Sequence, residues 1–249
     1  MAGVVLNNLS LGYERHPAVT GLSGAFAPSS LTAVVGPNGS GKTTLLKALA
    51  GHISPIAGSI DLGGTRPAQI AYLPQAHGLD LNFPLRLIDL VSLGFIGRRG
   101  LLGGLTLADR ERMAAAMVAV GLEGLEHRSI GSVSGGQLQR ALFARVLVQE
   151  AQLVLLDEPF TGVDTRAAED LAELMAGWPA QGRTVIAVLH DLDLARRLCP
   201  NTLVLAREQV AWGPSDMALT DDPLTRARRM AESWNAEEDA PLAQQDRVA

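Results

Sequence analysis

The strongest constraint on the fold is a glycine-rich octapeptide near the N-terminus, Gly36-Pro37-Asn38-Gly39-Ser40-Gly41-Lys42-Thr43. It fits the pattern G-x-x-x-x-G-K-[ST], follows the apolar run Leu31–Val35 and opens the helical pattern Lys42–Ala50. Glycines let backbone N–H groups approach an anion where side chains would obstruct them, and the helix N-terminus adds a partial positive charge. The sequence therefore predicts a strand, a phosphate-binding loop and a helix in succession.

The polar side chains of this segment suit a nucleoside triphosphate. Lys42 would offer a compact charge to the β- and γ-phosphates of ATP, and the Thr43 hydroxyl would ligate Mg²⁺. We assign residues 36–44, which include Thr44, to nucleotide binding. The alternative is a glycine turn before an ordinary helix. Only Lys42 and Lys47 among the 21 basic residues are lysines, so a lysine in this loop argues against that alternative.

Short apolar runs recur along the chain and predict a mostly parallel sheet covered on both faces. These runs are Leu31–Val35, Gln69–Leu73, Leu153–Asp157, Thr184–Leu189 and Thr202–Ala206. The stretch Val4 to Phe26 alternates and is broken by glycines, which predicts antiparallel strands at a sheet edge. A second strand pair is expected over Thr202–Trp212, turning at Arg207-Glu208.

The region from Gln75 to Val133 differs from the rest because strand signals fade there. Segments Leu85–Leu93 and Leu107–Val120 have helical periodicity, as does Gln137–Gln149 after them. We interpret residues 76–135 as a helical subdomain inserted into an α/β core of residues 2–75 and 136–235. The acidic, proline-containing segment 236–249 is predicted to be disordered.

Two carboxylates end one apolar strand, in the segment Leu153-Val154-Leu155-Leu156-Asp157-Glu158-Pro159. The carboxyl ends of parallel strands are where such sheets bind ligands. Asp157 would hold Mg²⁺ and Glu158 would act as general base on the attacking water. Acidic residues also end strands and cap helices in many proteins. This pattern therefore indicates a catalytic site only in combination with the glycine-rich loop.

Composition excludes several other classes of function. The net charge of −5 provides no basic footprint for nucleic acid, and Cys199 is the only cysteine, so neither an internal disulfide nor a zinc cluster is expected. The first residues lack a signal-peptide pattern, and no apolar run reaches the roughly 18 residues of a membrane-spanning helix. We therefore expect a soluble chain that reaches a membrane through partner subunits.

One further motif names a family. Val133-Ser134-Gly135-Gly136-Gln137 resembles the signature of ATP-binding cassette (ABC) proteins, with valine in place of the usual leucine. Ser134 can cap the helix that follows, and two glycines there expose N–H groups at a positive helix end. Taken alone, the same residues could be an ordinary capped helix after a glycine turn.

Four other positions resemble those of the ABC family and occur in its order. The resemblance implies that Tyr13 stacks on adenine and that Gln75 reaches Mg²⁺ and the attacking water. It also implies that Asp164 communicates across a dimer and that His190 contacts the γ-phosphate. Taken singly, Tyr13 could be a packed edge aromatic, Gln75 and Asp164 polar loop residues, and His190 a helix cap.

The resemblance extends over roughly residues 2–235 and implies an ATPase that works as a homodimer or paired cassette. ATP on one subunit would be enclosed by Ser134, Gly135 and Gly136 of the other. The partners it implies are integral membrane permease subunits and a substrate-binding protein. The place it implies is the cytoplasmic face of the cell membrane.

Finer detail resembles the importers of zinc, manganese and related metal ions. The segments concerned are Glu158–Asp164, Asn82-Phe83-Pro84 and Leu90–Gly94. The alternatives are an ABC ATPase for another substrate, such as a metal chelate, and a soluble ABC ATPase without a transport role. A kinase or GTPase is a third possibility, but a guanine-reading Asn-Lys-x-Asp motif is absent. We also hypothesise that a glycine-flanked loop with Phe95, Ile96, Arg98 and Arg99 helps to dock a membrane subunit; a surface loop without that role is the alternative.

Overall fold

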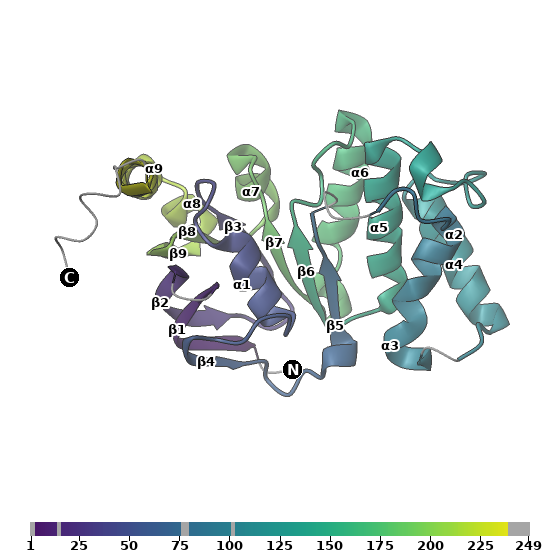
Figure 1. Cartoon of the computed structure of the whole chain (residues 1–249), viewed down its shortest axis with the longest axis horizontal. Helices are drawn as coiled ribbons and strands as arrows, with labels where there is room; N and C mark the ends of the chain where they lie inside the picture. Colours follow the sequence, from purple (N-terminus) through teal and green to yellow (C-terminus); the bar gives the residue numbers. More distant parts are fainter. Residues whose placement is uncertain (1–2, 14–15, 76–79, 101–102, 239–249) are drawn as a thin grey trace.

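The computed structural model describes residues 3–13, 16–75, 80–100 and 103–238. They form an α/β core with two sheets and a group of helices beside it (Figure 1). The elements are, in chain order, β1 (Val4–Tyr13), β2 (His16–Phe26), β3 (Leu31–Val35), α1 (Lys42–Leu49), β4 (Ala57–Asp61), β5 (Ile70–Leu73), α2 (Leu87–Ser92), α3 (Ile96–Arg99), α4 (Leu107–Ala119), α5 (Gly135–Gln149), β6 (Leu153–Asp157), α6 (Thr165–Ala176), β7 (Thr184–Val188), α7 (Leu192–Leu198), β8 (Asn201–Ala206), β9 (Glu208–Pro214), α8 (Ser215–Ala218) and α9 (Asp221–Glu238).

The larger sheet has the strand order β5-β6-β7-β3-β8-β9, and only β9 runs antiparallel to its neighbour. Its central strands β3, β6 and β7 are buried on both faces. Leu153 and Leu155 pack into the cluster that contains α1, whereas Val154 and Leu156 pack into the cluster that contains α5, α6 and α7. This two-sided burial requires the continuous apolar runs seen in the sequence, and the predicted parallel core is confirmed.

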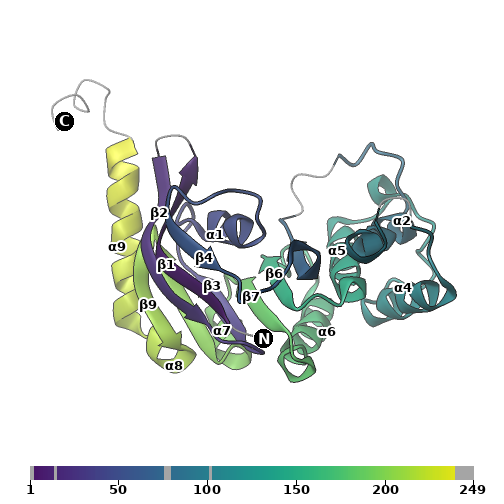
Figure 2. The same cartoon turned by 90° about the horizontal axis from the view of Figure 1, so that it is seen from below.

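The N-terminal strands form a sheet of their own, with the order β2-β1-β4. The predicted antiparallel pairing is confirmed, but these strands do not extend the edge of the parallel sheet. The backbone of β1 pairs with β4 on the side away from β2. Leu6, Leu9 and Leu11 of β1 turn inward onto α1, which lies between the two sheets (Figure 2).

The helices between β5 and β6 pack on one another at the end of the larger sheet (Figure 2). α5 contacts both α2 and α4. The predicted helix Leu85–Leu93 begins only at Leu87, because Arg86 forms a backbone bridge with Ser129. In contrast, α4 starts where predicted, since Thr106 caps it by accepting a hydrogen bond from the Asp109 N–H.

The segment hypothesised to dock a membrane subunit is not an open loop. Phe95 is buried in the main hydrophobic cluster, so this side chain is not on the surface, while Ile96 remains 37% exposed. Arg98 and Arg99 on α3 both form ion pairs with the buried carboxylate of Asp109 on α4. These two arginines therefore fasten α3 to α4.

The last helices cover the far end of the core. α9 lies along β8 and β9 and ends at Glu238; the predicted disordered tail begins at residue 236, and its residues 239–249 lie outside the described part of the chain. Within the residues that the structure describes, no helix combines the length and the apolar character needed to cross a bilayer.

The buried cysteine supplies a first prediction. Cys199 follows α7, where burial raises the pKa of its thiol to about 12. Since the thiolate is the reactive form, we expect the native chain to react with Ellman's reagent at about pH 8 roughly 10²-fold more slowly than the chain unfolded in urea. The absorbance of the released thiolate measures both rates. Equal rates in the two states would contradict the burial of this thiol.

Candidate functional site

The glycine-rich loop lies between the carboxyl end of β3 and the start of α1, as predicted. At two positions of the loop, neighbouring atoms approach the backbone so closely that only glycine fits. A Cβ on Gly36 would lie 2.0 Å from the Leu205 carbonyl oxygen, and one on Gly41 would lie 2.4 Å from Val19 Cγ2. Both residues also have positive φ angles, 154° and 93°, respectively. The loop is therefore wedged between β8 and β2.

Lys42 is folded back over this loop. Its ammonium group donates hydrogen bonds to the carbonyl oxygens of Gly36 at 2.9 Å and Pro37 at 2.7 Å. Burial lowers the pKa of Lys42, and the carboxylates of Glu158 and Asp157 act in the opposite direction. A cation held at the mouth of a loop of N–H groups is placed to bind phosphate oxygens.

Asp157 ends β6 directly beside the loop. Its side chain is fully buried; one carboxylate oxygen accepts a hydrogen bond from the Thr43 hydroxyl at 3.2 Å, and the other from the Tyr72 hydroxyl at 3.4 Å. Burial raises the pKa of this carboxyl group, whereas the Thr43 hydrogen bond lowers it. A carboxylate next to a hydroxyl is a donor set of the kind that Mg²⁺ prefers, so these residues fit that ion.

This burial predicts opposite effects of Asp157→Asn on stability and on Mg²⁺ binding. The raised pKa means that ionised Asp157 destabilises the nucleotide-free fold. This cost is absent below the unfolded pKa of about 3.9 and complete above the folded pKa. The variant should therefore melt at a higher temperature than the native chain near neutral pH, and the difference should shrink as the pH falls toward 4.

The same variant should lose the Mg²⁺-dependent part of its affinity for ATP. Differential scanning calorimetry without nucleotide and ATP titrations with and without Mg²⁺ measure the two effects. Asp170→Asn, at an exposed position of α6, is the control expected to change neither. A lower melting temperature for Asp157→Asn at neutral pH would show that the buried charge stabilises the fold.

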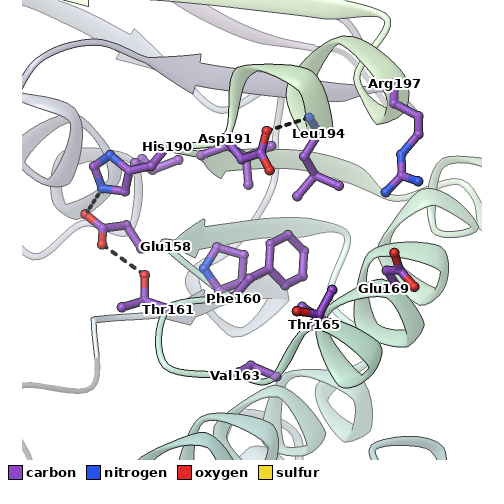
Figure 3. Close-up of a pocket in the computed structure, with 14 residues that line it drawn as sticks. Glu158, Phe160, Thr161, Val163, Thr165, Glu169, His190, Asp191, Leu194 and Arg197 are labelled. Atoms are coloured by element: carbon purple, nitrogen blue, oxygen red, sulfur yellow. Dashed lines mark hydrogen bonds and ion pairs between the residues drawn. The ribbon is translucent and has the colours of Figure 1, made fainter.

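Three side chains meet at Glu158, the next residue. The Gln75 side-chain amide donates to one carboxylate oxygen, and His190 Nε2 lies 2.6 Å from the same oxygen. The Thr161 hydroxyl donates to the other oxygen at 3.2 Å (Figure 3). Glu158 itself has a φ of 53°, a conformation unusual for a residue other than glycine. The structure thus brings together the three residues that were predicted to be catalytic.

Two pockets open on either side of this cluster. One, of about 630 Å³, is lined by Ala18, Asn38 to Thr44, Gln75, Glu158 and His190. The other, of about 370 Å³, lies between the segment after β6 and the start of α7, and also includes Glu158 and His190 (Figure 3). The first pocket contains the loop, Gln75, Glu158 and His190, so it is the candidate nucleotide site.

The segment that resembles the family signature does not reach this pocket. Ser134 caps α5 by accepting a hydrogen bond from the Gln137 N–H at 3.2 Å, as predicted, and both Ser134 and Gly135 are exposed. A Cβ on Gly136 would lie 2.6 Å from the Gly162 carbonyl oxygen. The signature therefore packs against the segment after Glu158, and its N–H groups lie outside the candidate nucleotide site of the same chain.

Asp164, another predicted site residue, is not among the residues that line the pocket. Asp164 caps α6 by accepting a hydrogen bond from the Ala167 N–H at 3.0 Å. Tyr13 is the last residue of β1, and its side chain lies outside the described residues. His190 does not cap α7; Asp191 does, by accepting hydrogen bonds from the N–H groups of Asp193 and Leu194.

Sequence reasoning missed Tyr72 and Thr161. Tyr72 pairs with Leu155 across parallel strands, so its side chain can extend along the sheet to Asp157. That register is not visible in the sequence, although Tyr72 lies only three residues before Gln75. Thr161 follows Glu158 by three residues, a spacing that could have indicated a local side-chain hydrogen bond.

Comparison with known proteins finds relatives over most of the chain. Residues 19–161 match the family model described as "ABC transporter". The chain is 35% identical over 230 residues to the manganese transport system ATP-binding protein of Bacillus subtilis, which covers 91% of this chain and 92% of that protein. It is 38% identical over 203 residues to the corresponding protein of Synechocystis, with 79% and 78% covered.

A solved structure of similar fold is an inward-facing metal-chelate type ABC transporter. The TM-score is 0.80 at 26% identity, with 92% of this chain and 90% of that chain covered. Sequence and structure therefore point to the same family.

Proposed function

The chain belongs to the ABC transporter family, as an ATPase, and from that premise we propose that it powers a membrane importer of metal ions. The observation that carries the catalytic part of this proposal is the convergence of Gln75 and His190 on Glu158 beside the glycine-rich loop. The metal-ion part is supported by the manganese transport systems to which the two relatives belong.

The loop of residues 36–44 would hold the ATP phosphates through the backbone N–H groups of its residues other than Pro37. Lys42 would exchange its two carbonyl partners for β- and γ-phosphate oxygens, which are stronger acceptors because they are charged. Tyr13 would stack on the adenine. Thr43, Gln75 and Asp157 would hold Mg²⁺, which neutralises charge on the transferred phosphoryl group.

Glu158 would take the proton of the attacking water as general base. Gln75 and His190 now share one of its oxygens, and Thr161 binds the other, so the carboxylate is held in one orientation. With ATP bound, Gln75 would turn to Mg²⁺ and the water, and His190 to the γ-phosphate. That exchange of partners would free Glu158 only when nucleotide fills the pocket.

A second copy of the chain would complete the site. Because Ser134, Gly135 and Gly136 lie outside the nucleotide pocket of their own chain, they are available to enclose ATP held by another. The N-terminus of α5 offers its partial positive charge there. Asp164 lies at the start of α6 and would carry the change across the dimer. The dimer would close when it binds ATP and open after hydrolysis, and this cycle would drive transport.

The transported substrate would reach the membrane through other subunits. We propose permease subunits that this chain contacts at the cytoplasmic face, together with a substrate-binding protein. Manganese or zinc ions are the favoured cargo, and a metal chelate is the alternative, which the solved metal-chelate type transporter illustrates. No nucleic-acid partner is proposed, since the net charge is −5.

The test is transport by the assembled system in proteoliposomes. Radioactive Mn²⁺ should move from the side of the substrate-binding protein into the compartment that contains the nucleotide only with ATP, and not when the complex carries Glu158→Gln. Unlabelled Mn²⁺ or Zn²⁺ should compete, whereas an iron chelate should not. If only the iron chelate competed, the transported substrate would be a metal chelate and not a free ion. ATP hydrolysis that never moves any metal would overturn the importer proposal.

A further inference from the structure

Arg207 links the glycine-rich loop to the C-terminal helix. It stands at the tip between β8 and β9, where its backbone N–H donates a hydrogen bond of 3.1 Å to the carbonyl oxygen of Ser40, a fully buried residue of the loop. The Arg207 carbonyl oxygen accepts a hydrogen bond of 2.7 Å from the Thr20 N–H of β2. One residue thus contacts the loop and the smaller sheet at once.

The backbone of Arg207 has a conformation that arginine rarely adopts. Its φ is 56°, in the left-handed region that favours glycine. Such a conformation persists when the surroundings hold it in place. The two backbone hydrogen bonds do so, together with a hydrogen bond of 3.4 Å from the Thr20 hydroxyl to the Arg207 carbonyl oxygen, and the side chain adds a further contact.

The side chain of Arg207 contacts α9. The Arg207 guanidinium lies 4.4 Å from the centre of the Trp234 ring, within the range of a cation–π contact. Trp234 is partly buried, on the same face of α9 as Leu224, Ala227 and Met230, and this face packs on the main core. Figure 2 shows α9 running alongside β9 at the side of the molecule away from α2 and α4.

The hydrogen bond to Ser40 has a consequence for the loop. A trans peptide is planar, so the carbonyl of Ser40 and the N–H of Gly41 point in opposite directions. Holding that carbonyl toward Arg207 turns the Gly41 N–H to the other side, and Gly41 lines the candidate nucleotide pocket. The orientation of one phosphate-binding donor therefore depends on Arg207.

We propose that Arg207 is a positioning residue for the phosphate loop, and that α9 tunes the affinity of this loop for ATP by holding Arg207 through Trp234. α9 lies outside residues 19–161, the part matched by the family model. A partner that binds α9 would thus change ATP affinity, and ATP would change the affinity for that partner by the same factor.

The dissociation constant for ATP, measured by calorimetry on the full chain, tests this inference. Arg207→Gly keeps the left-handed turn and removes the guanidinium; Trp234→Ala removes the ring. Each should weaken ATP binding about two- to fivefold, as expected for a cation–π contact near the surface. The double variant should bind no more weakly than the single ones, because both remove one link. Arg207→Lys and Trp234→Phe, which keep a cation and an aromatic ring respectively, should bind ATP with most of the native affinity.

Hydrogen exchange provides a readout that a purely structural role of α9 would not affect. In the native chain, ATP should slow exchange across α9, and this protection should be lost in Arg207→Gly. Arg228→Ala, on the exposed face of α9, is the matched control and should leave both readouts unchanged. Thermal unfolding without nucleotide is recorded for every variant.

Two outcomes overturn the inference. The first is that Arg207→Gly and Trp234→Ala both bind ATP with native affinity, even if Trp234→Ala melts at a lower temperature. The second is that the losses of binding free energy in the single variants add up in the double variant. The inference rests on ATP binding at the loop. If the native chain did not bind ATP, the proposed function itself would be wrong. If the native chain bound ATP and the variants bound it with the same affinity, only this inference would be wrong.

Discussion

Replacing Glu158 with glutamine is expected to lower ATP turnover by about 10²–10⁴-fold while ATP binding is retained. Glutamine is close in shape and can keep hydrogen bonds to Gln75, His190 and Thr161, but it cannot accept the proton of the attacking water. Under the proposal that hydrolysis opens the closed dimer, the variant should accumulate as an ATP-bound dimer. Phosphate release measures turnover, and light scattering with size-exclusion chromatography measures the dimer.

The matched control for this variant is Glu173→Gln on the exposed side of α6. It removes the same charge from the chain and should hydrolyse ATP at the native rate. Native turnover by Glu158→Gln would show that Glu158 is not the base. A variant that binds ATP, does not hydrolyse it and stays monomeric would require the same test on the assembled transporter.

Replacing Lys42 with methionine is expected to weaken ATP binding by about 10- to 100-fold, and turnover would fall with it. Methionine fills similar space in the buried position, so the loss reports the charge that Lys42 would bring to the phosphates. AMP, which lacks β- and γ-phosphates, should bind the native and variant chains alike. Calorimetry with ATP and AMP measures both affinities.

Lys47→Met is the control, because Lys47 is the only other lysine and lies at the last turn of the same helix. It should bind ATP as the native chain does. Lys42→Arg should not recover native binding, since a planar guanidinium cannot take the place of a compact ammonium bonded to the carbonyl oxygens of Gly36 and Pro37. If Lys42→Met bound ATP and AMP with native affinity, the assignment of the phosphate loop would be wrong.

Much of the larger sheet could be predicted because of how it is buried. β3 and β6 have the predicted bounds, since a strand covered on both faces must be apolar throughout and therefore stands out from its flanks. The loop after β3 was equally visible, because close backbone approach at Gly36 and Gly41 excludes other residues.

The rest depends on contacts between distant parts of the chain. β4 has the sequence Ala-Gly-Ser-Ile-Asp and is mostly exposed, so it forms only because β1 offers a free edge, and it was not predicted. Phe95 was expected in a surface loop, yet the helices around it enclose it. Motif resemblance suggested Gln75 and His190, but their meeting at one oxygen of Glu158 follows from the fold alone.

The central claim is that ATP is hydrolysed between two copies of the chain, one giving the loop and the other the signature. Gly135→Glu tests the second half. A Cβ at Gly135 has no atom within 4 Å, and an acidic residue suits the first turn of α5, so the fold should tolerate the change. In the dimer, however, the new carboxylate would face the phosphates of ATP bound to the other chain.

The most direct measurement is the ATPase activity of Gly135→Glu and Lys42→Met assembled separately and as an equal mixture. Each variant alone should be nearly inactive, because both of its sites are damaged. Half of the mixed dimers would contain both chains and hold one complete site of two, so about a quarter of native activity should return. Native turnover by Gly135→Glu alone, or a mixture no more active than its separate parts, would contradict the shared site.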